Sequence, residues 1–482
     1  MTIRYVFPSI LSCCTLVSMA QVPMLLKDIS ASGGSSPAAI TCVDGVVYFS
    51  ADDFTHGAEL WMSDGTTAGT VLIKDIVPGQ VGSLPSNFMA FNDRVYFDVN
   101  LGADGHRLWS TDGTEAGTRF ELDLDGVQGL TSYSNFAVYN NMILFTGATS
   151  AMGGELWMTD GTVEGTALLT EIVPGSLGSN PNKFTEYNGL LYFAASTPAI
   201  DVELWVTDGT AAGTHLVKDI DESTGSGAPS DLAVANGLLY FRATDGSMHG
   251  SELWVTDGTT EGTHLVKDIV PGGGGSTPRY MVAFNNEVWF TAFSNGDTEI
   301  WHSDGTEAGT SKLAVPPELY VQPSDLAAHA GYIYFTASIG TDKQLWMTDG
   351  TPTGTVQIVH PTSTVLSPLA STNGITSCGA TIFFSANYDG TGAEPYTLTN
   401  TVAVGEQIAE ARSLLYPNPA KDRLYMANAP ANGILYLYAT DGHLALQRSV
   451  TNMDISTLPN GLYMARVTGK NGRLLHVQRI VK

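Results

Sequence analysis

Three short segments of this 482-residue chain bring together histidine, arginine and aspartate, the side chains best suited to chemistry or polar recognition. A histidine ring gains or loses a proton near neutral pH, and a nearby carboxylate can orient it. The segments read Asp-x-x-His, Asp-x-His-Arg and Asp-x-x-x-His, which are spacings typical of loops. The candidate binding residues are Asp53, His56, Asp104, His106, Arg107, Asp245 and His249. Because glycine follows two of these histidines, the alternative is that they only shape their loops.

Motifs of the common catalytic classes do not occur in the sequence. Gly-x-Ser-x-Gly, His-Glu-x-x-His, P-loop and dinucleotide-binding patterns are all missing, so nucleophilic, zinc-protease and nucleotide chemistry lack support. We therefore assign no catalytic residue and no metal ligand. Two alternatives stay open. The 48 Asp and Glu residues could include a carboxylate pair for glycoside hydrolysis, and calcium is the one cofactor that so acidic a chain permits.

The candidate loops recur because the chain contains a tandem repeat of about 48 residues. The stretch ELWVTDGTAAGTHLVKDI at 203–220 returns at 252–269 with two changes. Each unit also has an upstream strand such as LYF. Tryptophan marks seven units, at steps of 45 to 49 residues: Trp61, Trp109, Trp157, Trp205, Trp254, Trp301 and Trp346. An eighth unit is worn, because Tyr396 stands where tryptophan is expected and the strand after it is missing.

Each unit is predicted to form four short antiparallel strands. An Asn-Gly turn joins the first pair in the fourth and fifth units, and the DGTxxGT turn joins the second pair. In that turn we expect Asp208 to accept backbone N–H groups, and Gly209 and Gly213 to supply a positive φ. Acids repeated in almost every unit are expected to be structural, because a working site usually draws a different set from a few units. Units rich in hairpins favour a β-propeller over a solenoid.

The two ends of the repeat array complement each other. VPMLLKDI at 22–29 matches the last strand of a unit but lacks the strands before it. We expect it to complete the worn eighth unit, which gives a closed all-β propeller of eight four-stranded blades; seven blades is the alternative. Cys42 and Cys378 fall in the matching innermost strands of the first and eighth units. Closure predicts either a disulfide between them or two buried thiols.

Two parts of the chain resemble known families. The repeat GxELWxTDGTxxGTxLVKDIxPGxxGS resembles the ELWxxDGT repeat family of secreted bacterial proteins over about residues 22–400, which implies no known reaction. LLYPNPAKDRLYM, GILYLYATDGHLAL, DISTLPNGLYMARV and RLLHVQRIVK resemble the type A C-terminal sorting domain of the type IX secretion system of Bacteroidota. This resemblance implies that the secretion machinery is a partner, that the chain is exported across the outer membrane, and that the tail is removed before surface attachment or release. The residues alone predict a small β-sandwich for the tail.

The sequence therefore predicts four segments: a signal peptide at 1–20, the propeller at 21–400, a linker at 401–413 and the sorting domain at 414–482. The first segment combines Arg4, an apolar run and small residues before Gln21, which is typical of a cleaved secretory signal. No later stretch is long and apolar enough for a transmembrane helix. From residue 410 the net charge is +5, which leaves −31 for the rest of a chain at −26. So acidic a propeller disfavours nucleic acid and anionic lipid as partners.

The sequence thus predicts an exported, non-catalytic propeller that binds a glycan or a surface protein, at the cell surface or outside the cell. The loops between second and third strands, and the connections between units, vary along the chain and lie at one end of the ring. Recognition usually resides in such loops on a rigid scaffold. The rival prediction is a carbohydrate-active enzyme, a hydrolase or lyase, with carboxylates at that end. A structural surface-layer component is the third.

Overall fold

The computed structural model describes residues 21–101, 106–122, 124, 127–223, 225–246, 248–315, 322–339, 342–360, 363, 369, 374–399, 415–416, 421–426, 434–439, 444–450, 453–468 and 474–482. The predicted signal peptide, the predicted linker and Asp104 lie outside these residues. The chain divides into two compact units near residue 402, and each is described by itself.

The first unit consists of eight antiparallel sheets of four strands, as the sequence predicts. We number them as blades 1 to 8 and give their strands from the innermost outward. Blades 1 to 4 are β2 (Ala38–Val43), β3 (Val46–Asp52), β4 (Ala58–Ser63) and β5 (Val71–Lys74); β6 (Ser86–Phe91), β7 (Arg94–Asn100), β8 (His106–Thr111) and β9 (Arg119–Leu122); β10 (Leu130–Tyr139), β11 (Met142–Thr149), β12 (Glu155–Thr159) and β13 (Ala167–Thr170); and β14 (Asn182–Tyr187), β15 (Leu190–Thr197), β16 (Asp201–Thr207) and β17 (His215–Lys218).

The other four blades complete the propeller. They are β18 (Ser230–Ala235), β19 (Leu238–Thr244), β20 (Ser251–Thr256) and β21 (His264–Lys267); β22 (Arg279–Phe284), β23 (Glu287–Ser294), β24 (Asp297–Ser303) and β25 (Ser311–Lys312); β26 (Gln322–His329), β27 (Tyr332–Ile339), β28 (Asp342–Thr348) and β29 (Val356–Ile358); and β30 (Ile375–Cys378), β31 (Thr381–Ala386), β32 (Glu394–Thr399) and β1 (Val22–Leu25). A 3-10 helix, η2 (Val127–Gly129), precedes β10. No helix among the described residues is long and apolar enough to cross a membrane.

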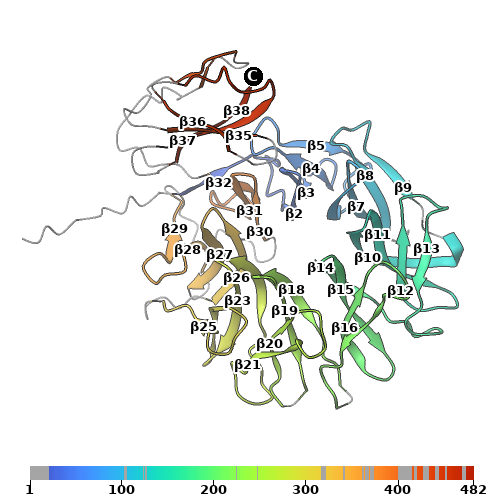
Figure 1. Cartoon of the computed structure of the whole chain (residues 1–482). Helices are drawn as coiled ribbons and strands as arrows, with labels where there is room; N and C mark the ends of the chain where they lie inside the picture. The colour runs from blue at the N-terminus through green and yellow to red at the C-terminus, as the bar shows by residue number, and fades with distance from the viewer. Residues whose placement is uncertain are drawn as a thin grey trace, which may run out of the picture. The chain divides into compact units, whose positions relative to one another are not determined.

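The eight blades form a closed ring (Figure 1). The innermost strand of each blade contacts the innermost strand of the next, in the order β2, β6, β10, β14, β18, β22, β26 and β30. The last of these contacts the first, because β30 lies against β2. Blades 8 and 1 are therefore neighbours, whereas blades 1 and 5 lie on opposite sides of the ring.

The N-terminal strand closes the ring by completing blade 8. β1 pairs antiparallel with β32, with Val22 opposite Thr399 and Leu25 opposite Tyr396. The next residue continues this pairing, since the N–H of Leu26 donates to a carbonyl oxygen of β32 at 3.0 Å. The two ends of the repeat array thus share one sheet, which confirms the predicted closure and the predicted number of blades.

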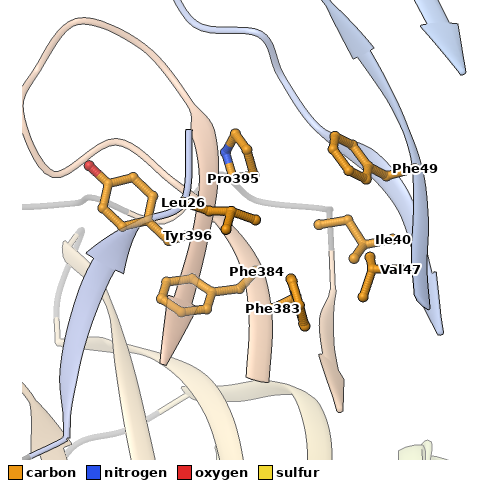
Figure 2. Close-up of a pocket in the computed structure, with 8 residues that line it drawn as sticks. All are labelled: Leu26, Ile40, Val47, Phe49, Phe383, Phe384, Pro395 and Tyr396. Atoms are coloured by element: carbon orange, nitrogen blue, oxygen red, sulfur yellow. The ribbon is translucent and has the colours of Figure 1, made fainter. Parts of the chain in front are cut away.

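The seam between blades 8 and 1 is apolar and covalently linked. Figure 2 shows side chains from both blades around one small pocket, among them Leu26, Phe383 and Phe49. These three side chains belong to one buried hydrophobic cluster, so the pocket is a gap in blade packing rather than a ligand site. Beside them a disulfide joins Cys42 of β2 to Cys378 of β30, with the two Cα atoms 5.3 Å apart.

Aromatic pairs fill the space between neighbouring blades. In blades 1 to 7 each tryptophan lies opposite a phenylalanine of the adjacent strand, as Trp61 lies opposite Phe49. In blade 8 the partner of Phe384 is Tyr396, and their rings stack with centroids 6.1 Å apart. Both are almost fully buried. Tyr396 therefore takes the tryptophan position, as predicted, and such buried aromatic area is a main source of blade stability.

In the DGTxxGT turns the predicted roles of Asp208 and Gly209 are confirmed, and the predicted conformation of Gly213 is not. Asp208 Oδ1 accepts the N–H of Thr210 at 2.8 Å and its hydroxyl at 2.7 Å, and the other DGT turns repeat these bonds. Gly209 has the expected positive φ, of 88°. Gly213 does not, so that prediction is wrong. Its requirement is space, because a Cβ there would lie 2.1 Å from Oδ1 of Asp208.

The described strands of the second unit form two sheets. One pairs β33 (Leu415–Tyr416) with β34 (Tyr425–Met426), and the other has the order β36 (Leu444–Ser449), β35 (Ile434–Ala439), β37 (Leu462–Thr468), β38 (Leu474–Val481). A buried apolar cluster that includes Leu424, Leu437 and Val467 forms its core. A full β-sandwich stays a prediction for this unit.

Candidate functional site

Strand direction sets which loops share one end of the propeller. Neighbouring strands in a blade are antiparallel, so the start of the innermost strand, the loop between second and third strands, and the connection after the outermost strand lie together. We call this the loop-rich end. The Asp53 loop, between β3 and β4, and the Asp245 loop, between β19 and β20, both lie there, as the sequence predicts.

Asp53 and His56 form one hydrogen-bonded pair within their loop. Asp53 Oδ2 lies 2.8 Å from Nδ1 of His56, and Oδ1 accepts the N–H groups of Thr55 and His56. Burial alone would raise the pKa of Asp53, but the bonds from His56 and Thr55 outweigh it and hold this pKa below its usual value. The hydrogen bond to Asp53 raises the pKa of His56.

Asp245 and His249 repeat this arrangement in blade 5. Asp245 Oδ2 lies 2.5 Å from Nδ1 of His249, and Oδ1 accepts the N–H of His249 at 3.0 Å. The bond to Asp245 raises the pKa of His249. In both loops the carboxylate is occupied by its own loop, which fits the alternative that these residues shape the backbone.

The structure does not gather the predicted residues into one site. The Asp53 pair and the Asp245 pair sit in blades 1 and 5, on opposite sides of the ring. Arg107 of blade 2 donates to the hydroxyl of Tyr133 at 3.2 Å, in blade 3. The side chain of His106, like Asp104, lies outside the described part of the chain. The sequence placed these loops at the correct end but could not place them around the circle.

The glutamates of the ELW segments hold the connections between blades. Glu59 is fully buried and accepts the N–H groups of Ile76 and Val77 at 3.1 and 3.0 Å and the hydroxyl of Ser83. Four further carboxylates also accept backbone N–H groups of such connections: Glu155, Glu203, Glu252 and Glu394. Burial raises the pKa of every one of them, and that of Glu203 to about 7. These acids serve the scaffold, as predicted for repeated acids.

The aspartates of the KDI segments are partly buried beside these glutamates. Asp75, Asp219 and Asp268 each have one buried Oδ1 that accepts no hydrogen bond from the residues described. Within the same residues, no group of three or more His, Cys, Asp or Glu side chains is close enough to hold a metal ion.

A second set of residues, which the sequence did not single out, lines the inner edge of the loop-rich end. In seven blades a β-bulge interrupts the innermost strand at a non-glycine residue with φ between 52° and 61°. We call these residues the inner rim: Ala39, Asn87, Asn135, Lys183, Asp231, Tyr280 and Asp325. Asn and Asp tolerate this left-handed conformation better than other non-glycine residues.

Charge gathers on the inner rim in blades 5 to 7. Asp231 pairs with Arg242 of the adjacent strand at 3.1 Å. Asp325 pairs with Lys343 at 3.2 Å, and it also accepts the hydroxyl of Thr336. Tyr280 lies between these two pairs in the ring. The signal that could have found them is a comparison across units of this single position, where RYM replaces the SNF or SDL of other blades.

Comparison with protein families identifies the end of the chain. Residues 414–482 match the model of the secretion system C-terminal sorting domain. The chain therefore carries a type IX secretion sorting tail, which implies secretion and handling by that machinery. The comparison with curated proteins found no match.

Several solved structures are similar to this chain. PorZ, an essential bacterial surface component of the type-IX secretion system of Porphyromonas gingivalis, is 15% identical at a TM-score of 0.43, over 91% of this chain and 64% of that one. Puromycin hydrolase is 13% identical at 0.44, over 74% and 59%. The β-propeller domain of the Trilobed protease from Pyrococcus furiosus is 11% identical at 0.39, over 67% and 94%. This chain spans about three fifths of the first two, and similarity this low carries no argument about function.

Proposed function

We propose that this chain is an exported β-propeller that acts as a non-catalytic binding or adhesion module, at the cell surface or outside the cell. The sorting tail supports export and surface attachment. On this proposal residues 1–20 are a signal peptide, residues 21–400 belong with ELWxxDGT-repeat proteins, and the tail is a sandwich that is removed or anchors the protein. The ligand is a glycan or a surface protein.

The observation that favours binding over catalysis is how the propeller uses its buried carboxylates. A glycosidase needs one carboxylic acid with a raised pKa and a second carboxylate about 5 to 10 Å away, both open to substrate. The glutamates whose pKa burial raises are sealed under the connections between blades, and Glu203, with a pKa raised to about 7, is fully buried. The rim acids Asp231 and Asp325 are held by cations instead.

The test is a glycan-array screen of the mature chain, residues 21–482, with and without calcium, followed by an assay of every hit for new reducing ends or unsaturated products. Saturable binding without turnover supports the proposal. Bond cleavage by a hit would favour the carbohydrate-active enzyme instead. Binding of neither glycans nor cell-surface proteins would leave a structural surface component as the better account.

A double variant, His56→Gln with His249→Gln, serves as the control for the loops predicted from the sequence. Since both histidines bond within their own loops, we expect it to bind glycans as the unaltered chain does. Loss of binding in this variant, with thermal unfolding unchanged, would return the site to those loops.

A further inference from the structure

Tyr280 occupies a backbone conformation that its side chain does not favour. Its φ is 54°, in the left-handed region, where the Cβ of a bulky residue crowds the backbone. Asn87 and Asn135 fill the same position in blades 2 and 3 at lower cost. The backbone therefore gives no reason for a tyrosine here. The residue is 39% exposed, so burial explains the tyrosine only in part. A strained residue of this kind points to a role in recognition.

Arg279 adds an available cation beside this ring. It precedes Tyr280 in β22, and it is exposed. Among the residues described, its guanidinium takes part in no ion pair. An Arg side chain without a partner, in a propeller as acidic as this one, is free to bind an anion in a bidentate manner.

The two neighbouring blades supply fixed hydrogen-bonding groups on either side. β22 contacts both β18 and β26. Asp231 of β18 is held by Arg242, which also donates to Ser230 at 2.9 Å, and Asp325 of β26 is held by Lys343. These pairs fix the carboxylates in place and still leave acceptor lone pairs for ligand hydroxyl groups.

Asp231, Tyr280 and Asp325 occupy the equivalent bulge position in three adjacent innermost strands, and β22 contacts both β18 and β26. Arg279, Tyr280 and both aspartates therefore form one patch across blades 5 to 7. In agreement with this arrangement, burial raises the pKa of Tyr280, the charges of Asp325 and Asp231 raise it further, and that of Arg279 opposes them. With Arg242 and Lys343, the cations that pair with the two aspartates, the patch has a net charge of +1. The propeller region as a whole is strongly negative.

The chemistry of the patch selects its ligand. A guanidinium binds a carboxylate, an exposed ring packs against the C–H face of a sugar, and the two aspartates accept hydroxyl donors. The carboxylates of an acidic peptide donate no hydrogen bond, so such a peptide leaves the two aspartates without donor partners. A highly charged polyanion is disfavoured by the net charge of −31 on residues 1–409.

We propose that the inner rim of blades 5 to 7 binds a saccharide that bears a carboxylate, with Arg279 on the acid group, Tyr280 against the sugar ring, and Asp231 and Asp325 on hydroxyl groups. This inference rests on the proposed function as a binding module and gives it a site and a ligand class.

The experiment compares two ligands and three variants on the mature chain. The ligands are a uronic-acid oligosaccharide and its carboxyl-reduced neutral counterpart, with binding measured by calorimetry. The variants are Arg279→Gln, Tyr280→Asn and Arg119→Gln. Asn suits the left-handed backbone, which keeps the bulge intact, and Arg119 is an exposed arginine on the outer strand β9 that serves as the matched control. Thermal unfolding checks that each variant is folded.

We expect Arg279→Gln to weaken binding of the acidic oligosaccharide about ten-fold or more, the effect of losing a charged hydrogen-bond pair. Arg119→Gln should change it less than about two-fold. The unaltered chain should bind the neutral counterpart about ten-fold more weakly than the acidic oligosaccharide. The Arg279→Gln variant should bind the two ligands equally, because the substitution and the loss of the carboxylate remove the same interaction. Tyr280→Asn should weaken both ligands.

Each of the following outcomes would overturn the inference. Equal binding of the acidic and neutral ligands would remove the role of Arg279, and equal effects of Arg279→Gln and Arg119→Gln would reduce it to general electrostatics. Displacement of the saccharide by an acidic peptide, dependent on Arg279, would assign the site to peptides. If glycans bind but ignore all rim variants, this inference fails while the proposed function stands; if no glycan or surface protein binds, both fail.

Discussion

Cys42 and Cys378 are separated by 336 residues and are joined by a disulfide across the seam where the propeller closes. A crosslink that spans most of a domain restricts the unfolded chain strongly, and its loss costs about 2 to 4 kcal/mol in typical proteins. We therefore expect the Cys42→Ala, Cys378→Ala double variant to lose about that much free energy of unfolding in guanidinium titrations. The unaltered chain should lose the same amount in reductant, and the double variant should not respond to reductant. Equal stability of the oxidised and reduced chains would contradict this expectation.

The pairing of β1 with β32 predicts that blade 8 can be opened and repaired. A chain that begins at Ser30 lacks the closing strand and exposes the edge of β32, so it should melt at a lower temperature and self-associate as its concentration rises. A synthetic peptide of residues 21–29 should restore the melting temperature, because it supplies the missing strand and the N–H of Ile29 that Glu394 accepts. A scrambled peptide of the same composition is the control, and rescue by both peptides alike would argue against specific pairing.

The sequence predicted the ring well because its repeats report on blade packing. Trp61 and Tyr396 mark equivalent places in different blades, so the spacing of such residues gives the number of blades directly.

The sequence predicted the candidate site less well for two physical reasons. Asp53 and Asp245 belong to equivalent loops, and only the geometry of a ring sets them four blades apart. Tyr280 is found only through a β-bulge, which inserts one residue into an otherwise regular strand and leaves little trace in hydrophobic alternation.

Glu203 makes the stability of the propeller depend on pH. Four of the buried ELW-type carboxylates accept a serine hydroxyl, but blade 4 has Gly227 at that place, which leaves burial less compensated and raises the pKa of Glu203 to about 7. An acid whose folded-state pKa lies above its unfolded value stabilises the fold below the unfolded pKa, and this contribution is lost as pH rises through the folded pKa. The raised pKa of His56 and of His249 acts in the same direction. The free energy of unfolding should therefore fall between about pH 5 and pH 7.

Urea titrations at pH 5, 6 and 7 test this dependence, and two variants identify the group responsible. Glu203→Gln removes the titrating group and should flatten the curve. Gly227→Ser should flatten it partly by supplying the hydroxyl donor found in the other blades, once the carboxylate shifts away from the new Cβ. A stability that rises from pH 5 to pH 7, or a slope that Glu203→Gln leaves unchanged, would assign the pH response to other groups.

Lys183 tests whether the inner rim stores backbone strain. Its φ is 61° and its side chain is exposed, so replacing it changes the backbone preference and little else. Lys183→Asn should raise the free energy of unfolding by about 0.5 to 1 kcal/mol, because asparagine tolerates the left-handed conformation. The reverse change at the equivalent exposed position, Asn87→Lys, should lower it by a similar amount. Measuring both in about 0.5 M salt screens the change in charge. If the two substitutions shift stability in the same direction, the bulge is not strained. Backbone strain would then give no reason to assign Tyr280 a role in recognition.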